Sequence, residues 1–329
     1  MPTSKSISSL VTDFCWGAWS ELGVSGWGRR HEDWAIDPEA LIVFTASNNG
    51  SDLRLRDEAM DWCIRNWRHV SQTRLRNVLR SESDETDVWG TFAATVNARA
   101  GFHWPGATTE RSSYSLTGRS ILRSLSEPSL VFLRMRAMFG VGARTEILRY
   151  FLFNPLTKMT ANALADVTLY TKRNVAEACE LLVQADLLSA KTVGNRFYYS
   201  LTDAQTLAAF VGPAPEIAPD WNALLRVVGA IKRLSDEADK LSVDALIVET
   251  HQVARDIGED LDVLAIEGSR WLRGARILDE WDQWSAEVMS DLASGAWPSE
   301  AAESSVSVLP TAETRRPRKS TRQKEPAAN

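Results

Sequence analysis

The sequence predicts a mainly α-helical, multi-domain protein with one small β-hairpin near its centre. In several stretches apolar residues recur at spacings of three and four, the period of amphipathic helices. Side chains alternate in the pattern of β-strands at 188–201, on both sides of the two-residue turn signal Gly194-Asn195. The length of 329 residues fits two or three domains. We expect a helical domain at 1–128, a hairpin-bearing domain at 129–210, a helical region at 211–298 and a disordered tail at 299–329.

Composition and cysteine usage indicate a cytoplasmic protein. Hydrophobic residues make up 44% of the chain and charged residues 24%, which is ordinary for a globular protein. No run of eighteen apolar residues appears, and the N-terminus lacks the apolar core of a signal peptide, so we expect no membrane span. Cys15, Cys63 and Cys179 are isolated in the sequence, which favours reduced thiols in the core.

The first 128 residues are rich in tryptophan and in helical patterns. Eight of the thirteen tryptophans fall in the first 104 positions, and most are expected to be core residues. Trp27 and Trp34 lie outside clear periodicity, beside Arg29, Arg30 and His31, and are the alternative candidates for a pocket. Asp37-Pro38 has the cap-then-proline order that begins a helix. The stretch at 102–126 is expected to be a loop.

Helices expected at 52–67 and 72–80 admit two interpretations. They could form a second helix-turn-helix whose outer face carries Arg74, Arg76 and Arg80. The preferred interpretation is a helix pair in which these exposed arginines form ion pairs with the acidic residues at 57–61.

The stretch from Arg144 to Leu201 predicts three helices in close succession, followed by a hairpin. A helix at 129–139 precedes it, and the first of the three begins near Arg144. The second, at 160–167, buries Ala163, Leu164 and Val167, and the link at 168–170 has the length that a helix-turn-helix needs. Thr171 then provides the N-cap of the third helix.

The third helix has one apolar stripe and one exposed polar end. Its stripe comprises Val175, Ala178, Cys179, Leu182 and Ala185. Lys172, Arg173, Asn174, Glu177 and Gln184 point away from that stripe. Arginine pairs well with guanine and asparagine with adenine in the major groove of DNA. The first turn therefore has the side chains of a helix that reads base edges.

The hairpin follows this helix directly. Gly194 supplies the positive φ of the turn, and Phe197, Tyr199 and Leu201 share one face of the return strand. Lys191 and Arg196 flank the tip, where basic side chains can follow a phosphate backbone.

This order of elements, over 144–201, resembles the winged helix-turn-helix domain, most closely the ArsR/MarR type of bacterial regulator. The Leu-x-x-Ala-x-Leu-Leu run at 182–188 is similar to the run that ends the recognition helix there, although Asp186 stands where glycine is usual. The resemblance implies double-stranded DNA as partner and a homodimer. The candidate DNA-binding residues are Lys172, Arg173, Asn174, Glu177, Lys191, Asn195 and Arg196.

The C-terminal third is acidic and helical. Residues 211–298 carry 8 Lys or Arg against 17 Asp or Glu, so we expect this region to face away from DNA. Three helices are expected there, at 220–238, 242–257 and from 260 to about 292, and the resemblance implies a dimer interface. The basic cluster at 315–319 in the tail either adds phosphate affinity or is simply solvated.

No motif indicates an enzyme, a metal site or a bound cofactor. The chain lacks a phosphate-binding glycine loop, HExxH and GxSxG, and its four histidines are scattered. We therefore expect a sequence-specific DNA-binding transcriptional regulator. The alternative is an adaptor or antitoxin-like subunit that uses the winged helix and the acidic C-terminal helices to bind a protein, since winged helices also serve as docking modules.

Overall fold

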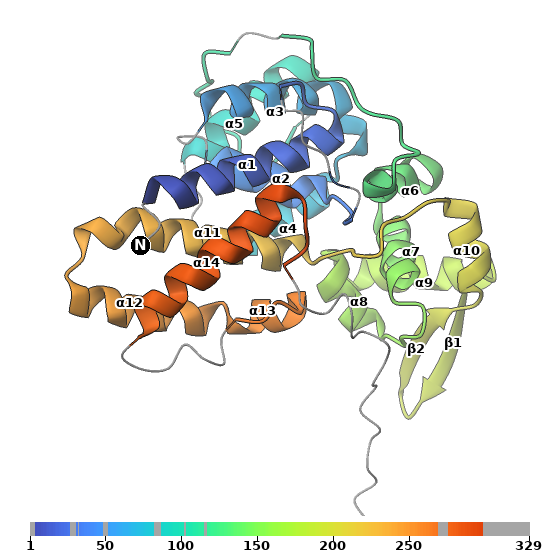
Figure 1. The fold of residues 1–329 in the computed structure, drawn as a ribbon. Coiled ribbons are helices and arrows are strands. Elements are labelled where there is room, and N and C mark those ends of the chain that lie inside the picture. The colour runs from blue at the N-terminus through green and yellow to red at the C-terminus, as the bar shows by residue number, and fades with distance from the viewer. Residues whose placement is uncertain are drawn as a thin grey trace, which may run out of the picture. The chain divides into compact units, whose positions relative to one another are not determined.

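The computed structural model describes residues 4–26, 31, 33–48, 52–81, 87–101, 103–114, 117–268 and 276–298. Within these ranges the fold is mainly helical, with one antiparallel sheet of two strands (Figure 1). Among the described helices, none is both long enough and apolar enough to cross a membrane. The expectations for Trp27, Arg29, Arg30 and the tail at 299–329 lie outside the described residues.

Nine of the described helices share one hydrophobic core and are called the helical body here. They are α1 (Ser4–Leu22), α2 (Pro38–Ser47), α3 (Leu53–Asn66), α4 (Gln72–Ser81), α5 (Asp87–Ala100), α11 (Trp221–Glu237), α12 (Val243–Asp256), α13 (Gly258–Leu264) and α14 (Ile277–Ser294). The first helix, α1, packs against α11 and α14 from the other end of the chain (Figure 1). The regions 1–128 and 211–298, expected as separate, thus contribute to the same core.

Most of the described tryptophans of the body are core residues, as expected, and Trp34, the alternative pocket candidate outside clear periodicity, is buried as well. Trp19, Trp34, Trp62 and Trp221 are among the largest fully buried side chains. Three of their indole N–H groups reach an acceptor: Trp19 donates to Thr45 Oγ1 at 2.8 Å, Trp62 to the Leu22 carbonyl at 2.7 Å and Trp221 to the Ala35 carbonyl at 2.7 Å. A buried indole combines a large apolar area with one polar group, and these bonds satisfy that group.

The loop after α5 is held to α3 by polar contacts. The Tyr114 hydroxyl donates to Asp61 at 3.1 Å, and Thr117 and Ser120 donate to Glu58 at 3.2 and 2.8 Å. The described parts of the stretch expected as a loop contain no helix or strand before residue 128. These hydrogen bonds satisfy two carboxylates that lie buried on α3.

A second core holds the middle of the chain together, and we call this part the hairpin module. It comprises α6 (Val131–Phe139), α7 (Ala143–Phe153), α8 (Ala161–Thr168), α9 (Lys172–Gln184), β1 (Leu188–Val193), β2 (Arg196–Leu201) and α10 (Ala204–Val211). Three short 3₁₀ turns, Trp67–His69, Pro128–Leu130 and Ala238–Lys240, lie outside it. Val175, Ala178, Cys179 and Leu182 of α9 are buried against this core, as the stripe predicts.

The two strands form the expected hairpin. They pair antiparallel from Leu188 with Leu201 to Val193 with Arg196, and Gly194 has a φ of +61° in the turn. Met159 adds an isolated antiparallel bridge to Tyr199. Tyr199 is buried while Phe197 is exposed, because Phe197 lies next to the turn, opposite Thr192, whereas Tyr199 lies further along the strand, where Met159 bridges it.

Some expectations for single residues and elements were wrong. Val167 and Ala185 are exposed, although both were placed on buried stripes. Thr168 is buried instead of Val167, and it donates to the Leu164 carbonyl at 2.6 Å. Ala185 is the C-cap of α9 and lies past the covered part of the helix. The helix α10 was not predicted, and the long helix expected from 260 is two helices, α13 and α14.

Candidate functional site

The first turn of α9 is exposed. The Thr171 hydroxyl accepts a hydrogen bond from the Asn174 amide at 3.3 Å, which makes Thr171 the N-cap, as predicted. Lys172, Arg173 and Asn174 are all exposed, and Arg173 has 87% of its side-chain surface accessible. Arg173 Nε lies 2.9 Å from Glu177 Oε1 one turn later. This ion pair is fully solvated, so Arg173 can exchange it for another acceptor at little cost.

The hairpin tip carries the other three candidates. Lys191 on β1 lies opposite Tyr198, and Arg196 begins β2 opposite Val193. Lys191, Asn195 and Arg196 are exposed. The two-residue turn fixes this register, and a register fixed in this way also fixes the face on which each side chain lies.

A groove of about 670 Å³ lies between α8, α9 and the hairpin. Three candidates, Lys172, Asn195 and Arg196, line it together. The other four, Arg173, Asn174, Glu177 and Lys191, are exposed but are not part of its lining. The groove also contains Asp166 and Glu180, whose carboxylates repel phosphate. Its electrostatic character is therefore mixed, with the cations at the N-terminus of α9 and at the hairpin.

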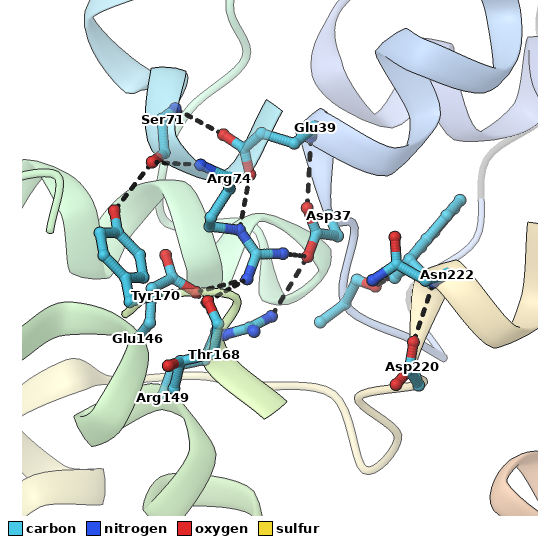
Figure 2. Close-up of polar contacts among 12 residues, drawn as sticks. Asp37, Glu39, Ser71, Arg74, Glu146, Arg149, Thr168, Tyr170, Asp220 and Asn222 are labelled. Atoms are coloured by element: carbon cyan, nitrogen blue, oxygen red, sulfur yellow. Dashed lines mark hydrogen bonds and ion pairs between the residues drawn. The ribbon is translucent and has the colours of Figure 1, made fainter. Parts of the chain in front are cut away.

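A second constellation, which the sequence reasoning missed, is a buried network of six charged side chains between the helical body and the hairpin module. Three guanidinium groups meet three carboxylates there. The members are Asp37, Glu39, Arg74, Arg136, Glu146 and Arg149. Figure 2 shows Arg74 surrounded by Asp37, Glu39 and Glu146. Arg74 was expected to be exposed and paired with the acids of α3, and both parts of that expectation are wrong.

Arg74 and Arg136 are almost completely hydrogen-bonded. Arg74 donates to Asp37, to Glu39 Oε2 at 3.1 Å and to the Thr168 carbonyl at 3.0 Å. Arg136 donates to both oxygens of Glu39, to Glu146 Oε1 and to the His69 carbonyl, all within 3.0 Å. A buried guanidinium group is tolerated only when carboxylates and carbonyls replace its hydration in this way.

Neighbouring charges lower the pKa of two carboxylates of the network, whereas burial and the charge of Asp37 raise the pKa of Glu39 in spite of its contacts with Arg136 and Arg74. Burial by itself raises the pKa of Glu146, but Arg136, Arg149 and Arg74 lower it to about 2. The same competition holds for Asp37, where burial raises the pKa and Arg74, Arg149 and Arg136 lower it below its ordinary value. Arg149 differs, because burial lowers its pKa and the attraction of Glu146 does not restore it.

Polar contacts also join the body to the turn between α8 and α9. The hydroxyl groups of Ser71 and Tyr170 are 2.8 Å apart, and Asn77 on α4 donates to the Leu169 carbonyl at 2.8 Å (Figure 2 shows the first of these). Leu169 has a left-handed φ of +59° in this turn. The polypeptide that leads into α9 is therefore held by α4.

The sequence did contain a signal for the buried charges. Glu39 precedes Val43 by four residues, Arg74 precedes Val78 by four, and Arg136 follows Phe132 by four. Residues four apart share one face of a helix, so each charge lies on the apolar face of its own helix. A charged group on such a face indicates a buried ion pair when a partner of opposite sign exists elsewhere.

The described residues do not bring together three or more His, Cys, Asp or Glu side chains that could hold a metal ion. The three cysteines are buried and free, and burial raises the pKa of Cys15 and Cys179 to about 12. His31 is buried against Trp34, with ring centroids 4.2 Å apart. Trp34 itself is fully buried in the core of the helical body, and among the described residues its indole N–H has no hydrogen-bond partner.

Comparison with protein-family models, with curated proteins and with solved structures gives no match to this chain.

Proposed function

We propose that the protein is a sequence-specific DNA-binding regulator whose hairpin module acts as a winged helix-turn-helix. In this proposal α8 and α9 are the helix-turn-helix, α9 enters the major groove and the β1–β2 hairpin is the wing. One observation carries the proposal: Lys172 at the start of α9 and Arg196 at the hairpin line the same open groove. A duplex that receives α9 in its major groove would meet donors from both elements.

The side chains at the start of α9 have the chemistry of base readout. Arg173 and Asn174 are exposed and precede the first buried residue of the helix, Val175. A bidentate contact of either type is worth about 1–3 kcal/mol of discrimination between bases. Lys191 and Arg196 would contact phosphates, which position the protein on the duplex without reading sequence.

The test is selection of a binding sequence from random duplex DNA, followed by binding measurements on variants. The Arg173→Ala plus Asn174→Ala variant should bind the selected site about 100-fold more weakly, since two contacts are lost and each costs roughly a factor of ten. The matched control is Arg99→Ala plus Arg111→Ala, two exposed arginines of the helical body that lie outside both the hairpin module and the C-terminal helices. Equal affinity of the wild type and the α9 variant would refute the proposed mode of reading.

The proposal includes a homodimer formed through the C-terminal helices. Val243 and Val248 on α12 and Val263 on α13 are exposed, at 66%, 68% and 64%. Exposed apolar side chains on an otherwise charged surface favour contact with another protein. Sedimentation velocity should show a dimer for the wild type and a monomer for Val248→Glu. A monomeric wild type at micromolar concentration would remove this part of the proposal.

The same valines favour the second candidate, an adaptor that binds a protein. Acidic residues surround them, and Asp166 and Glu180 in the module groove weaken attraction to phosphate. The selection from random duplex DNA should be repeated at low salt, where attraction to phosphate is strongest. If no sequence is enriched even then, the adaptor function is favoured over the regulator function.

A further inference from the structure

Residues 62–81 of the helical body are rich in arginine, and we call them the basic segment. They include five arginines and no aspartate or glutamate, in a chain whose net charge is −6. The segment comprises the end of α3, the turn Trp67–His69 and the helix α4. Arg74 is buried in the charge network, whereas the other four arginines, at 65, 68, 76 and 80, are exposed. The basic segment therefore gives an otherwise acidic chain a cationic surface.

The acidic residues of α3 do not neutralise the exposed arginines of α4. Their carboxylates accept instead from Arg56 and from hydroxyl groups of the loop after α5. Among the described residues, Arg76 and Arg80 form no ion pair, so the pairing expected with the acids at 57–61 is wrong for them too. Two guanidinium groups on the outer face of α4 are thus available to a partner.

The basic segment also holds the turn that leads into α9. The side chains of Ser71, Arg74 and Asn77 each form a hydrogen bond with this turn, at 168–170, over 2.8 to 3.0 Å (Figure 2 shows Ser71 and Arg74). The helix α9 begins two residues after the turn, at Lys172. The cationic surface of α4 is therefore next to the end of α9 that carries the candidate base-reading side chains.

Arg80 is the arginine whose position relative to this turn is best determined. Its Nη1 lies 3.5 Å from Asn77 Oδ1, and Nδ2 of the same amide donates to the Leu169 carbonyl at 2.8 Å. A single amide group thus separates this guanidinium group from the backbone that leads into α9. Arg76 precedes Arg80 by four residues, which places both on one exposed face of α4.

We infer that α4 is a second DNA contact, in which Arg76 and Arg80 bind backbone phosphates beside the bases that α9 reads. The inference rests on the proposed function, because α9 determines where the duplex lies. A guanidinium group binds a phosphate through two parallel N–H bonds. Such contacts position a protein on the duplex without reading its sequence. The helical body then takes part in holding DNA, which the resemblance to a winged helix does not predict.

The salt dependence of DNA binding by the full chain tests this inference. The variant Arg76→Ala plus Arg80→Ala should reduce the slope of log K against log salt by about 2, since two phosphate contacts are lost. The ratio of its affinities for the selected and the random duplex should equal that of the wild type, because phosphate contacts do not read sequence. Arg76→Lys plus Arg80→Lys keeps both charges and should keep the slope of the wild type.

The matched control is Arg99→Ala plus Arg111→Ala, which removes two exposed arginines of the body outside the basic segment. Its slope should equal that of the wild type. An unchanged slope in the α4 variant overturns the inference. Equal reductions in the α4 variant and the control also overturn it, because net charge and not position would then determine the slope.

Neutral methylphosphonates, placed singly along the selected duplex, locate the contacts. At one or two positions the substitution should weaken binding by the wild type but not by the Arg76→Ala plus Arg80→Ala variant, which has already lost the partner of that phosphate. If the same positions weaken binding by both proteins to the same extent, α4 does not contact the backbone and the inference is wrong.

The outcomes also separate this inference from the proposed function. If Arg173→Ala plus Asn174→Ala weakens binding to the selected site while the α4 variant binds like the wild type, the inference alone fails. If the wild type binds no duplex even at low salt, the proposed function fails and the inference fails with it.

Discussion

Arg136 on α6 and Glu39 on α2 are joined by two parallel hydrogen bonds, Nη1 to Oε1 at 2.7 Å and Nη2 to Oε2 at 2.8 Å. Both side chains are inaccessible to solvent. The pair connects the hairpin module to the helical body in a single orientation, because the planar fork of a guanidinium group matches a carboxylate in only one plane.

Removing Arg136 should destabilise the protein strongly. In Arg136→Met the carboxylates of Glu39 and Glu146 lose their main partner, and breaking one side of a buried ion pair costs about 3–5 kcal/mol. Urea denaturation followed by circular dichroism measures this. Glu177→Gln, which breaks the solvated pair with Arg173, should leave the midpoint unchanged. Similar midpoints for the two variants would show that the buried network contributes little to stability.

His31 should make the stability fall at acidic pH. Burial lowers its pKa to about 3, and neither ring nitrogen has a hydrogen-bond partner among the residues that the structure describes. The unfolded chain therefore takes up a proton near pH 6.5, whereas the folded chain takes it up only near pH 3. The stabilising contribution is complete above pH 6.5 and is lost as the pH falls, by up to about 1.4 kcal/mol per pH unit.

The variant His31→Phe isolates this effect. Phenylalanine keeps a ring beside Trp34 but cannot be protonated. Urea midpoints at pH 8, 7, 6 and 5 should fall less steeply for the variant than for the wild type. Parallel pH profiles would mean that other groups determine the acid sensitivity.

Asp186→Gly should stabilise the protein. Asp186 follows the C-cap of α9 with a left-handed φ of +56°, and the Leu187 amide donates to the Leu182 carbonyl at 3.0 Å in a Schellman motif. Glycine adopts this conformation without the penalty of roughly 1–2 kcal/mol that a Cβ brings. After subtraction of the roughly 0.5–1 kcal/mol that the flexibility of glycine costs, we expect a net gain of about 0.5 kcal/mol. Thermal unfolding measures it, and Asp186→Ala should not show the gain.

The hairpin cations should determine the salt dependence of DNA binding. If Lys191 and Arg196 each neutralise one phosphate, replacing either by alanine should reduce the slope of log K against log salt by about 1. The effect should be the same for specific and random DNA, because phosphate contacts do not read sequence. Lys240→Ala, exposed in the helical body, is the control. An unchanged slope in both hairpin variants would place the hairpin away from the duplex.

Local features of the fold were predictable because short-range rules determine them. The N-caps at Asp37 and Thr171, the hairpin turn at Gly194 and the buried stripe from Val175 to Leu182 agree with the structure. Each depends on residues within one or two turns of chain. The exposure of Lys172, Arg173 and Asn174 follows in the same way from the position of that stripe.

Long-range relationships were not predictable from periodicity. Arg74 was expected at the surface because arginine rarely enters a core without a partner, and its partners lie 35 to 72 positions away at Asp37, Glu39 and Glu146. The C-terminal region was set apart at 211 because the proline-containing stretch 211–219 has the composition of a linker. Composition does not show that α11 and α14 return to pack on α1.

The packing of α14 on α1 sets an order for folding during synthesis. The hairpin module is continuous in the chain, so it can fold as soon as its residues leave the ribosome, at roughly 5–20 residues per second. The body must wait for α14, almost 300 residues after the start, before α1 is covered. Until then the early helices expose apolar surface, which makes nascent chains stalled before residue 277 candidates for chaperone capture.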